Sequence, residues 1–313
     1  MDKPYTTYEE QVKILDNKKL IIKEKERVIY LLKKCGYFGL ITGYKHPFKG
    51  KDGNYKKHTT IDDIYALYQY DMELRELFLR YILVIENKLK SLISYSFCEK
   101  YGDLESDYLN VTNFDYISSK QEDINKLIGK LQRAMNSSEK HPYVQHQRER
   151  HGNIPLWALM RVLTLGMVSK MYSLLKSEAQ ALVSKEFESV REDELTQMVD
   201  LLSRFRNVCA HNERLYDYKY LMGEIKTTNV HRSLNLKKKG DYYEQGKKDL
   251  FAVAIVFKYL LDKDEFDTFI DRFDELTNRL LEDTRIIQKA QILKLMGFPE
   301  NWKEIKDCAK CSA

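Results

Sequence analysis

The sequence predicts an all-α protein, and three observations lead to this prediction. Apolar residues recur at steps of three and four along most of the 313 residues, the spacing that places them on one face of a helix. Segments with the strict alternation of strands are scarce. The hydrophobic content of 43% is sufficient for a packed core, yet no apolar run approaches the ~18 residues of a membrane span. We therefore expect a soluble helical protein.

The first third of the chain is expected to form three helices. Residues 8–19 and 24–34 combine apolar and charged residues at helical spacing. Thr60, followed by Asp63, is typical of a capping box, which opens a long helix to about Tyr101. One apolar stripe of this long helix consists of Leu74, Leu77, Phe78, Tyr81, Ile85, Leu89, Leu92 and Ile93.

The remainder of the chain continues the helical pattern with one interruption. Helices are predicted at residues 119–136, 155–175, 177–188, 192–214, 249–261 and 264–283. A short hairpin is expected within residues 227–243, because the segment TTNVHRSLNL alternates before Gly240. No repeat and no linker rich in Pro, Gly or Ser divides the chain. We expect one domain over residues 1–313, with a core at roughly residues 60–284 and an N-terminal helical extension at residues 1–59.

Composition and the N-terminus favour a cytoplasmic protein. The first residues, MDKPYTTYEEQ, carry acids and lack the apolar stretch of a signal peptide. Five cysteines, an odd number, fit reduced thiols better than a disulfide framework. His141, His146 and His151 follow at steps of five, which scatters them around a helix, whereas zinc-binding pairs lie four residues apart. No metal site and no cofactor is expected.

The net charge of +5 is unevenly distributed along the sequence. Residues 45–58 carry a net charge of +4 and residues 226–248 carry +5, so the remaining chain is slightly acidic. Basic loops with tyrosines among the lysines suit a phosphate backbone with stackable bases, although a loop that only keeps the protein soluble has the same composition. The RNA-binding candidates are Lys45, Lys49, Lys51, Tyr55, Lys56 and Lys57 in the first segment, and Arg232, Lys237, Lys238, Lys239 and Tyr243 in the second.

Polar residues interrupt the apolar pattern of the predicted helix at residues 192–214. Its buried face is expected to consist of Leu195, Met198, Leu202, Phe205 and Cys209. Arg206, Asn207, His211 and Arg214 fall among these residues, although a polar group in a core needs a partner to offset its desolvation. On a regular helix, the side chains of Arg206 and His211 point about 140° apart. Either Arg206 bends around, or the helix ends near His211, or a second copy of the helix completes the site.

Four elements of the sequence, in order, resemble a known family. The stretch RNVCAHNERLY, from Arg206 to Tyr216, is similar to the RN-x-CAH-x-x-RL signature of the Abi-like family, the bacterial abortive-infection proteins AbiD and AbiF. It contains the R-x4-H motif of the HEPN (higher eukaryotes and prokaryotes nucleotide-binding) superfamily. The stretches 37–44, 83–86 and 154–166 resemble, respectively, that family's aromatic YYRLSGY element, its long helix with an internal acid and its P-x-W…G segment.

The resemblance implies a HEPN-like helical bundle, here with additional helices and two basic loop or hairpin excursions. It also implies a metal-independent endoribonuclease that acts as a homodimer, with the two motifs facing one cleft. Cleavage of RNA by its own 2′-hydroxyl requires a proton acceptor, a proton donor and positive charge on the phosphate. His211 would be the acid or base, and Arg206 would stabilise the charge.

The remaining site residues have supporting roles in this interpretation. Asn207 would orient the imidazole or the phosphate, and Arg214 would bind a neighbouring phosphate. Glu86 either pairs with Arg206 or belongs to a buried network. Cys209 is expected to be a small core residue.

Three functions follow from these features. The first is an endoribonuclease toxin of phage defence, and the second is a catalytically dormant RNA-binding protein that acts by sequestration. The third, a helical scaffold for proteins, is disfavoured because protein interfaces are depleted of lysine. Arg206 and His211 together favour the nuclease over the dormant protein. The resemblance adds one partner, a structured noncoding RNA that serves as antitoxin, beside the target RNA that the nuclease would cut.

Overall fold

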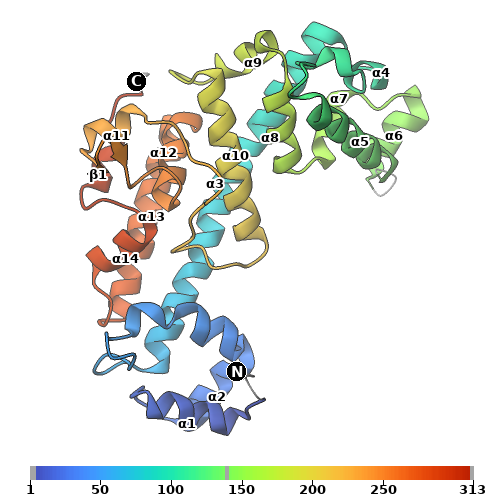
Figure 1. Cartoon of the computed structure of the whole chain (residues 1–313). Coiled ribbons are helices and arrows are strands. Elements are labelled where there is room, and N and C mark those ends of the chain that lie inside the picture. The colour runs from blue at the N-terminus through green and yellow to red at the C-terminus, as the bar shows by residue number, and fades with distance from the viewer. Residues whose placement is uncertain (1–4, 138–140, 311–313) are drawn as a thin grey trace.

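The computed structural model describes residues 5–137 and 141–310, and it confirms the all-α prediction (Figure 1). The longest element is α3 (Ile61–Tyr101), which runs from the N-terminal helices to the opposite end of the molecule. Thr60 and Asp63 form the predicted capping box at its start. The helices that pack most extensively along α3 are α9 (Ser177–Ser184), α10 (Glu192–Ala210) and α13 (Lys263–Asp283).

The N-terminal region packs against the beginning of α3. It comprises α1 (Tyr8–Asn17), α2 (Lys25–Cys35), a π-helical turn η1 (Phe38–Thr42) and a 3-10 turn η2 (His46–Phe48). The first basic segment, residues 45–58, belongs to this region and is anchored by buried Pro47, Phe48 and Tyr55. It is therefore part of the packed structure rather than a free loop.

The far end of α3 is covered by a group of shorter elements. They are α4 (Glu105–Tyr108), η3 (Val111–Asn113), α5 (Gln121–Ser137), α6 (Pro142–His151), α7 (Leu156–Leu159), η5 (Met160–Val162) and α8 (Leu165–Leu174). The single helix predicted at residues 155–175 is wrong, because the chain is extended at Leu163 and restarts at Thr164. The Thr164 side chain accepts a hydrogen bond from the Met167 amide, which makes it the N-cap of α8.

The C-terminal elements lie beside α3, and α13 packs directly against it. They are α11 (Asn229–Ser233), β1 (Lys238–Lys239), β2 (Tyr242–Tyr243), α12 (Leu250–Leu260), α13, α14 (Lys289–Met296) and η6 (Trp302–Lys306). The predicted hairpin is present but shorter than expected, since its strands pair only Lys238 with Tyr243 and Lys239 with Tyr242. The stretch before it is helical because Thr228 caps α11 through a hydrogen bond with His231.

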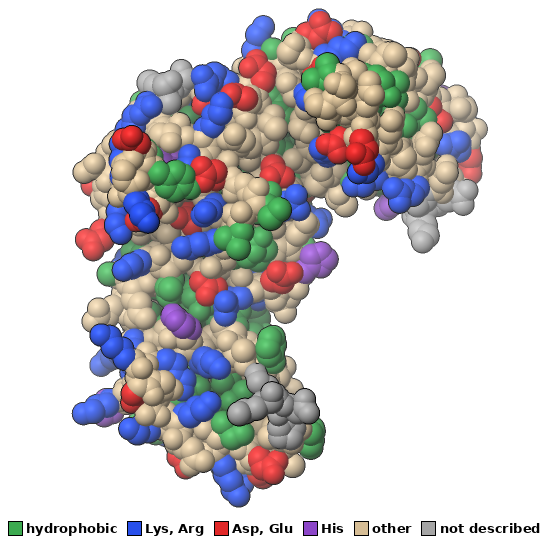
Figure 2. Space-filling model, viewed as in Figure 1, with side chains coloured by type: hydrophobic (Ala, Val, Ile, Leu, Met, Phe, Trp, Pro, Cys, Tyr) green, Lys and Arg blue, Asp and Glu red, His purple; other side chains and the backbone are tan. Residues whose placement is uncertain are grey.

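One continuous cluster of buried side chains extends from Val12 to Cys308. Aromatic rings connect its parts, as Phe78 of α3 contacts Phe257 of α12 and Phe269 of α13 with centroid distances of 5.7 and 5.1 Å. None of the helices in the described residues combines the length and apolar character that a bilayer crossing requires. Figure 2 shows that the molecule is bent, with a broad concave side between the N-terminal helices and the end that carries α4 to α7.

A buried histidine makes the stability of the C-terminal part depend on pH. His231 is 0% exposed, and its two ring nitrogens bond the Thr228 amide and the Gly246 carbonyl at 3.0 and 2.9 Å. Burial, with positive charge from Lys247 and Arg232, lowers the pKa of His231 to about 4. The imidazole is therefore neutral in the folded protein at a pH where the unfolded chain already binds a proton.

Acidification from pH 6.5 to pH 4 is therefore expected to destabilise the protein through this residue. A folded-state pKa below the ordinary value of 6.5 provides stability that is complete above pH 6.5 and is lost as the pH falls toward 4, about 3 kcal/mol in total. Urea unfolding across this range should show a flatter pH dependence for His231→Gln than for the wild type. Parallel pH profiles for the two proteins would contradict this assignment.

Candidate functional site

The candidate site is built on the C-terminal end of α10. Its apolar face forms as predicted, with Leu195, Met198, Leu202, Phe205 and Cys209 all buried. The predicted helical range, 192–214, is too long, because the α-helix ends at Ala210. His211 is the C-cap residue, and the next residue, Asn212, has a left-handed backbone with φ of 57°. The helix therefore ends near His211, as the second alternative expects.

A polar stripe follows the exposed face of α10 toward this end. Asp200 and Arg204 form an ion pair at 3.7 Å, and Asn207 and His211 continue the stripe at the next two turns. Among the described residues, neither the Asn207 amide group nor the His211 imidazole has a hydrogen-bond partner. Both side chains are exposed, so they are free to bind an external ligand.

Arg206 lies on a different flank of α10 and faces α3. Its Nε atom is 3.9 Å from Oε2 of Glu86, which is 5% exposed. Oε1 of Glu86 pairs with Lys90 at 2.7 Å, while Oε2 and the Arg206 Nε have no hydrogen bond among the described groups. The predicted pairing of Glu86 with Arg206 is therefore present as a charge contact, and within one chain Arg206 does not point along the His211 face.

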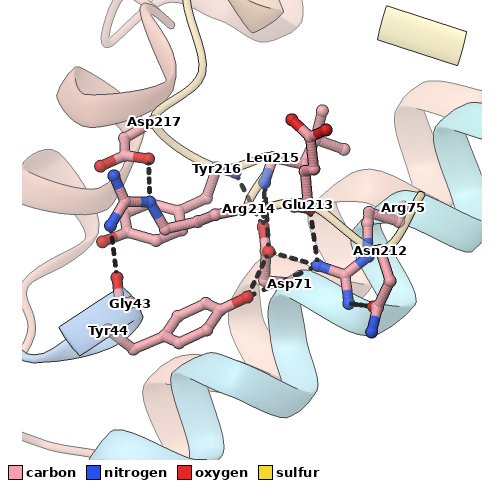
Figure 3. Close-up of polar contacts among 10 residues, drawn as sticks. All are labelled: Gly43, Tyr44, Asp71, Arg75, Asn212, Glu213, Arg214, Leu215, Tyr216 and Asp217. Carbon is pink, nitrogen blue, oxygen red and sulfur yellow. Dashed lines mark hydrogen bonds and ion pairs between the residues drawn. The ribbon is translucent and has the colours of Figure 1, made fainter. Parts of the chain in front are cut away.

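A buried carboxylate holds the loop that follows His211 (Figure 3). Asp71 of α3 is 0% exposed and accepts hydrogen bonds from the amides of Leu215 and Tyr216 at 3.2 and 2.7 Å. It also accepts the Tyr44 hydroxyl at 2.8 Å and the Arg75 guanidinium at 2.5 Å. Burial is the largest influence and raises the pKa of Asp71, while Arg75 and the other donors act in the opposite direction.

Arg75 extends this network to the residue after His211. Its Nη2 donates to Oδ1 of Asn212 at 2.6 Å, and its Nη1 donates to the Glu213 carbonyl at 3.2 Å. The left-handed turn at Asn212 is thus fixed by a side chain from α3. Sequence reasoning missed Tyr44, Asp71 and Arg75, although a usable signal exists. Asp71 lies three residues before Leu74 on the apolar stripe, with a cation four residues later.

Arg214 joins this loop to the N-terminal region. Its Nε donates to Asp217 at 2.6 Å, and its Nη1 donates to the Gly43 carbonyl at 2.6 Å (Figure 3). The guanidinium is therefore committed to two intramolecular contacts. Although 40% of the side chain is exposed, its clearest role is to position the loop, and the phosphate-binding role expected from the sequence stays a prediction.

Two grooves lie on either side of the end of α10. The groove between α5, α8 and α10 has a volume of about 800 Å³ and includes Asn207, Arg204, Lys126, Lys130 and Lys170 among its lining residues. The second, which we call the η1 groove, has a volume of about 760 Å³. It lies between η1 and the loop after His211, and its lining residues include Phe38, Thr42, Tyr68, Asn212, Tyr218 and Leu221.

The first basic segment contributes fewer surface groups than predicted. Tyr55 is 5% exposed, so the prediction that its ring stacks on RNA is wrong. The Nζ of Lys49 lies 3.3 Å from the centroid of that ring, and burial lowers the pKa of Lys49 to about 8. Lys56 Nζ donates to the Pro47 carbonyl at 2.7 Å. The side chains that remain available to an external ligand are those of Lys45, half-buried, and Lys51 and Lys57, both exposed.

The second basic segment is exposed at the hairpin. Lys237, Lys238, Lys239 and Arg232 lie on the surface, and only Lys237 has an ion-pair partner, Glu244 at 3.0 Å, among these four in the described structure. Tyr243 is 7% exposed and packs against His231, so the predicted stacking of its ring on RNA is wrong. Figure 2 shows basic and acidic side chains interspersed across the face in view.

Cys209 and the residue types that bind metals complete the description of the site. Burial raises the pKa of Cys209 to about 12, so the thiol stays protonated and serves as a core residue. Within residues 5–137 and 141–310, no group of three His, Cys, Asp or Glu side chains is arranged to hold a metal ion. The catalytic roles expected for Arg206, Asn207 and His211 stay predictions.

Comparisons with known proteins identify the family. No curated protein and no solved structure gives a significant match to the chain. A family model described as Abi-like protein matches residues 30–217, which is more than half of the chain and includes η1, Glu86 and the end of α10 with His211. The chain therefore belongs to the Abi-like protein family.

Proposed function

We propose that this Abi-like protein is a metal-independent endoribonuclease toxin of phage defence, which causes abortive infection by cutting RNA. The observation that carries this proposal is the exposed His211 at the end of α10, which has no side-chain partner among the described residues, with Arg206 five residues earlier on the same helix. An exposed imidazole that has no structural partner is available for proton transfer. The family membership supports the defence role.

The chemistry requires no group beyond these side chains and the RNA itself. One imidazole takes the proton from the 2′-hydroxyl, whose oxygen then attacks the adjacent phosphorus. An imidazolium gives a proton to the departing 5′-oxygen, so the products carry a 2′,3′-cyclic phosphate and a 5′-hydroxyl. Arg206 stabilises the additional negative charge on the phosphoryl oxygens with its planar guanidinium.

A second protomer supplies the geometry that one chain lacks. Arg206 faces Glu86 on α3, whereas His211 is exposed at the helix end, so the two side chains of one chain do not converge. In a homodimer with the two α10 ends facing each other, the Arg206 of one protomer lies beside the His211 of its partner. Each such pair is one cleavage site, in which the imidazole takes the proton of the 2′-hydroxyl and the imidazolium so formed gives it to the departing 5′-oxygen.

One specific contact supports the alternative function, a catalytically dormant protein that binds RNA without cutting it. The Arg206 side chain is only 29% exposed and faces a buried carboxylate, so substrate must compete with Glu86 for its charge. A protein in which Glu86 keeps Arg206 permanently would bind RNA without cutting it and would act by sequestration. Binding without cleavage, together with normal toxicity of His211→Ala, is the result that would favour this alternative.

We further propose that a structured noncoding RNA binds the exposed basic segments and controls the toxin. Neutralising Lys237, Lys238 and Lys239 with glutamine should lower the slope of log affinity against log salt by about two to three, if each lysine contacts one phosphate. A matched triple variant of exposed lysines elsewhere, Lys100, Lys185 and Lys263, should leave the slope unchanged. Equal slopes in the wild type, the hairpin variant and the control variant would show that the hairpin lysines do not contact RNA and only keep the protein soluble.

The proposed activity is tested with purified protein, RNA and EDTA. Cleavage should proceed in the chelator, and the products should be labelled by polynucleotide kinase at their 5′ ends without prior phosphatase treatment. Their 3′ ends should be 2′,3′-cyclic phosphates. Cleavage that stops in EDTA and returns with a divalent metal would reject the metal-independent mechanism.

A further inference from the structure

We propose that the η1 groove is a base-binding subsite, which holds an unpaired nucleotide of the RNA next to the phosphate that is cut. This inference rests on the proposed function and names the form of its substrate, a single strand. The lining of the groove includes Asn212, the residue that directly follows His211. A nucleotide within it is therefore a neighbour of a phosphate that lies against the imidazole.

The rim of the groove presents an aromatic ring that the fold does not use. Phe38 is 80% exposed, although the residues after it in the π-helical turn, Leu40 and Ile41, are buried. Opposite sides of the groove come from η1 and from the loop that contains Leu221, which is 78% exposed. Apolar surface of this kind, held out into water on a short π-helical turn, is typical of a functional site. An exposed ring also serves as a stacking platform for bases of any sequence.

The groove contains polar groups that suit the edge of a base. Among the described residues, the hydroxyls of Thr42 and Tyr218 have no hydrogen-bond partner, and both belong to the lining. Asn212 uses its Oδ1 to accept from Arg75, which leaves its amide N–H donors free. The Arg75 contact also fixes the orientation of the amide, so these donors are pre-organised.

The groove suits a nucleotide better than a second copy of the chain. Its volume of about 760 Å³ lies within the range of small-ligand pockets, roughly 300 to 1,000 Å³. Five charged side chains lie in its lining, namely Arg75, Glu213, Arg214, Asp217 and Lys219. The cores of protein interfaces are depleted of lysine and acidic residues, so this lining disfavours a second copy of the chain as the occupant.

Gly39 contributes bare backbone to the lining of the groove. A Cβ atom added at Gly39 would meet no atom within 4 Å, and its backbone φ lies outside the left-handed region. A larger side chain at this position is therefore compatible with the fold and would add bulk at the lining of the groove. This provides a variant that blocks the subsite without removing any contact.

The test measures binding of a short unstructured RNA that contains 5-iodouridine to His211→Ala protein, which serves as a non-cleaving background. Adding Phe38→Ala should weaken binding about 5- to 100-fold, Phe38→Tyr should restore it, and Gly39→Leu should weaken it with Phe38 intact. Photocrosslinks should map to Phe38 or to residues 218–221. Tyr95→Ala, which removes a ring 71% exposed on α3, is the matched control and should bind normally.

Unchanged binding in both Phe38→Ala and Gly39→Leu would overturn the subsite, as would a Phe38→Ala variant that turns a dimer into a monomer. The nuclease proposal and the subsite proposal can be rejected independently of each other. Wild-type protein that does not cleave RNA, while crosslinks still map to the η1 groove, would reject the nuclease and support the subsite. Normal cleavage with an unaltered KM in Phe38→Ala protein would reject the subsite and leave the nuclease standing.

Discussion

Replacement of His211 by alanine is expected to lower RNA cleavage by about 10²- to 10⁴-fold, the range that positioned acid–base catalysis contributes. Toxicity in cells should disappear with it. The free energy of unfolding should change by less than about 0.5 kcal/mol, because the side chain is exposed and has no partner among the described residues. Initial rates on a fluorescent RNA, together with urea unfolding, measure both quantities.

A second exposed histidine provides the control, which shows whether the loss of cleavage is specific to His211. His146 is exposed on α6, and His146→Ala should cleave RNA at the wild-type rate. Cleavage by His211→Ala that equals the wild-type rate would remove His211 from the mechanism. Loss of cleavage accompanied by unfolding would instead assign His211 a structural role.

Replacement of Asp71 by asparagine is expected to destabilise the protein by about 3 to 5 kcal/mol, the cost of breaking a buried ion pair. The Arg75 side chain, 5% exposed, would keep its charge without a carboxylate, and the new amide N–H groups would face other donors. Urea unfolding measures this loss. Limited proteolysis at residues 212–216 should also accelerate, since Asp71 holds the amides of Leu215 and Tyr216.

An exposed ion pair that also involves α3 provides the control for this prediction. Asp62 pairs with Arg27 at 2.9 Å, and both side chains are substantially exposed, 55% and 41%. Asp62→Asn should cost about 1 kcal/mol or less, because water screens the pair. Equal losses of stability in the Asp62 and Asp71 variants would show that burial does not strengthen the Asp71 contact.

The elements that depend on interactions between neighbouring residues were predicted closely. The long helix was expected from Thr60 to about Tyr101 and is found at Ile61–Tyr101, because the capping box of Thr60 and Asp63 needs only neighbouring residues. The end of α10 was placed four residues too late. Its left-handed turn at Asn212 depends on Arg75 and Asp71, which are more than 100 residues away in the sequence, so helical periodicity alone does not indicate it.

The candidate site was likewise predicted only in part. The order and spacing of Arg206, Asn207 and His211 are visible in the sequence, and so is Glu86 as a partner for Arg206. The burial of Tyr55 and Tyr243 was not predicted, because a tyrosine among lysines has the same composition whether its ring faces water or the core. Lys49 and Lys238 lie over these two rings, so the lysines that suggested RNA stacking instead cover the aromatic surface.

Co-expression of Arg206→Ala and His211→Ala chains tests the central claim, a cleavage site built from Arg206 of one protomer and His211 of the other. Each variant alone should be inactive. About half of the dimers formed by random mixing contain both chains, and each mixed dimer retains one site with Arg206 and His211 from opposite protomers. Cleavage in the mixture, absent from either variant alone, is the result that this account predicts. A mixture as inactive as its components, alongside active wild-type protein, would contradict it, because Arg206 and His211 would then have to act within the same chain.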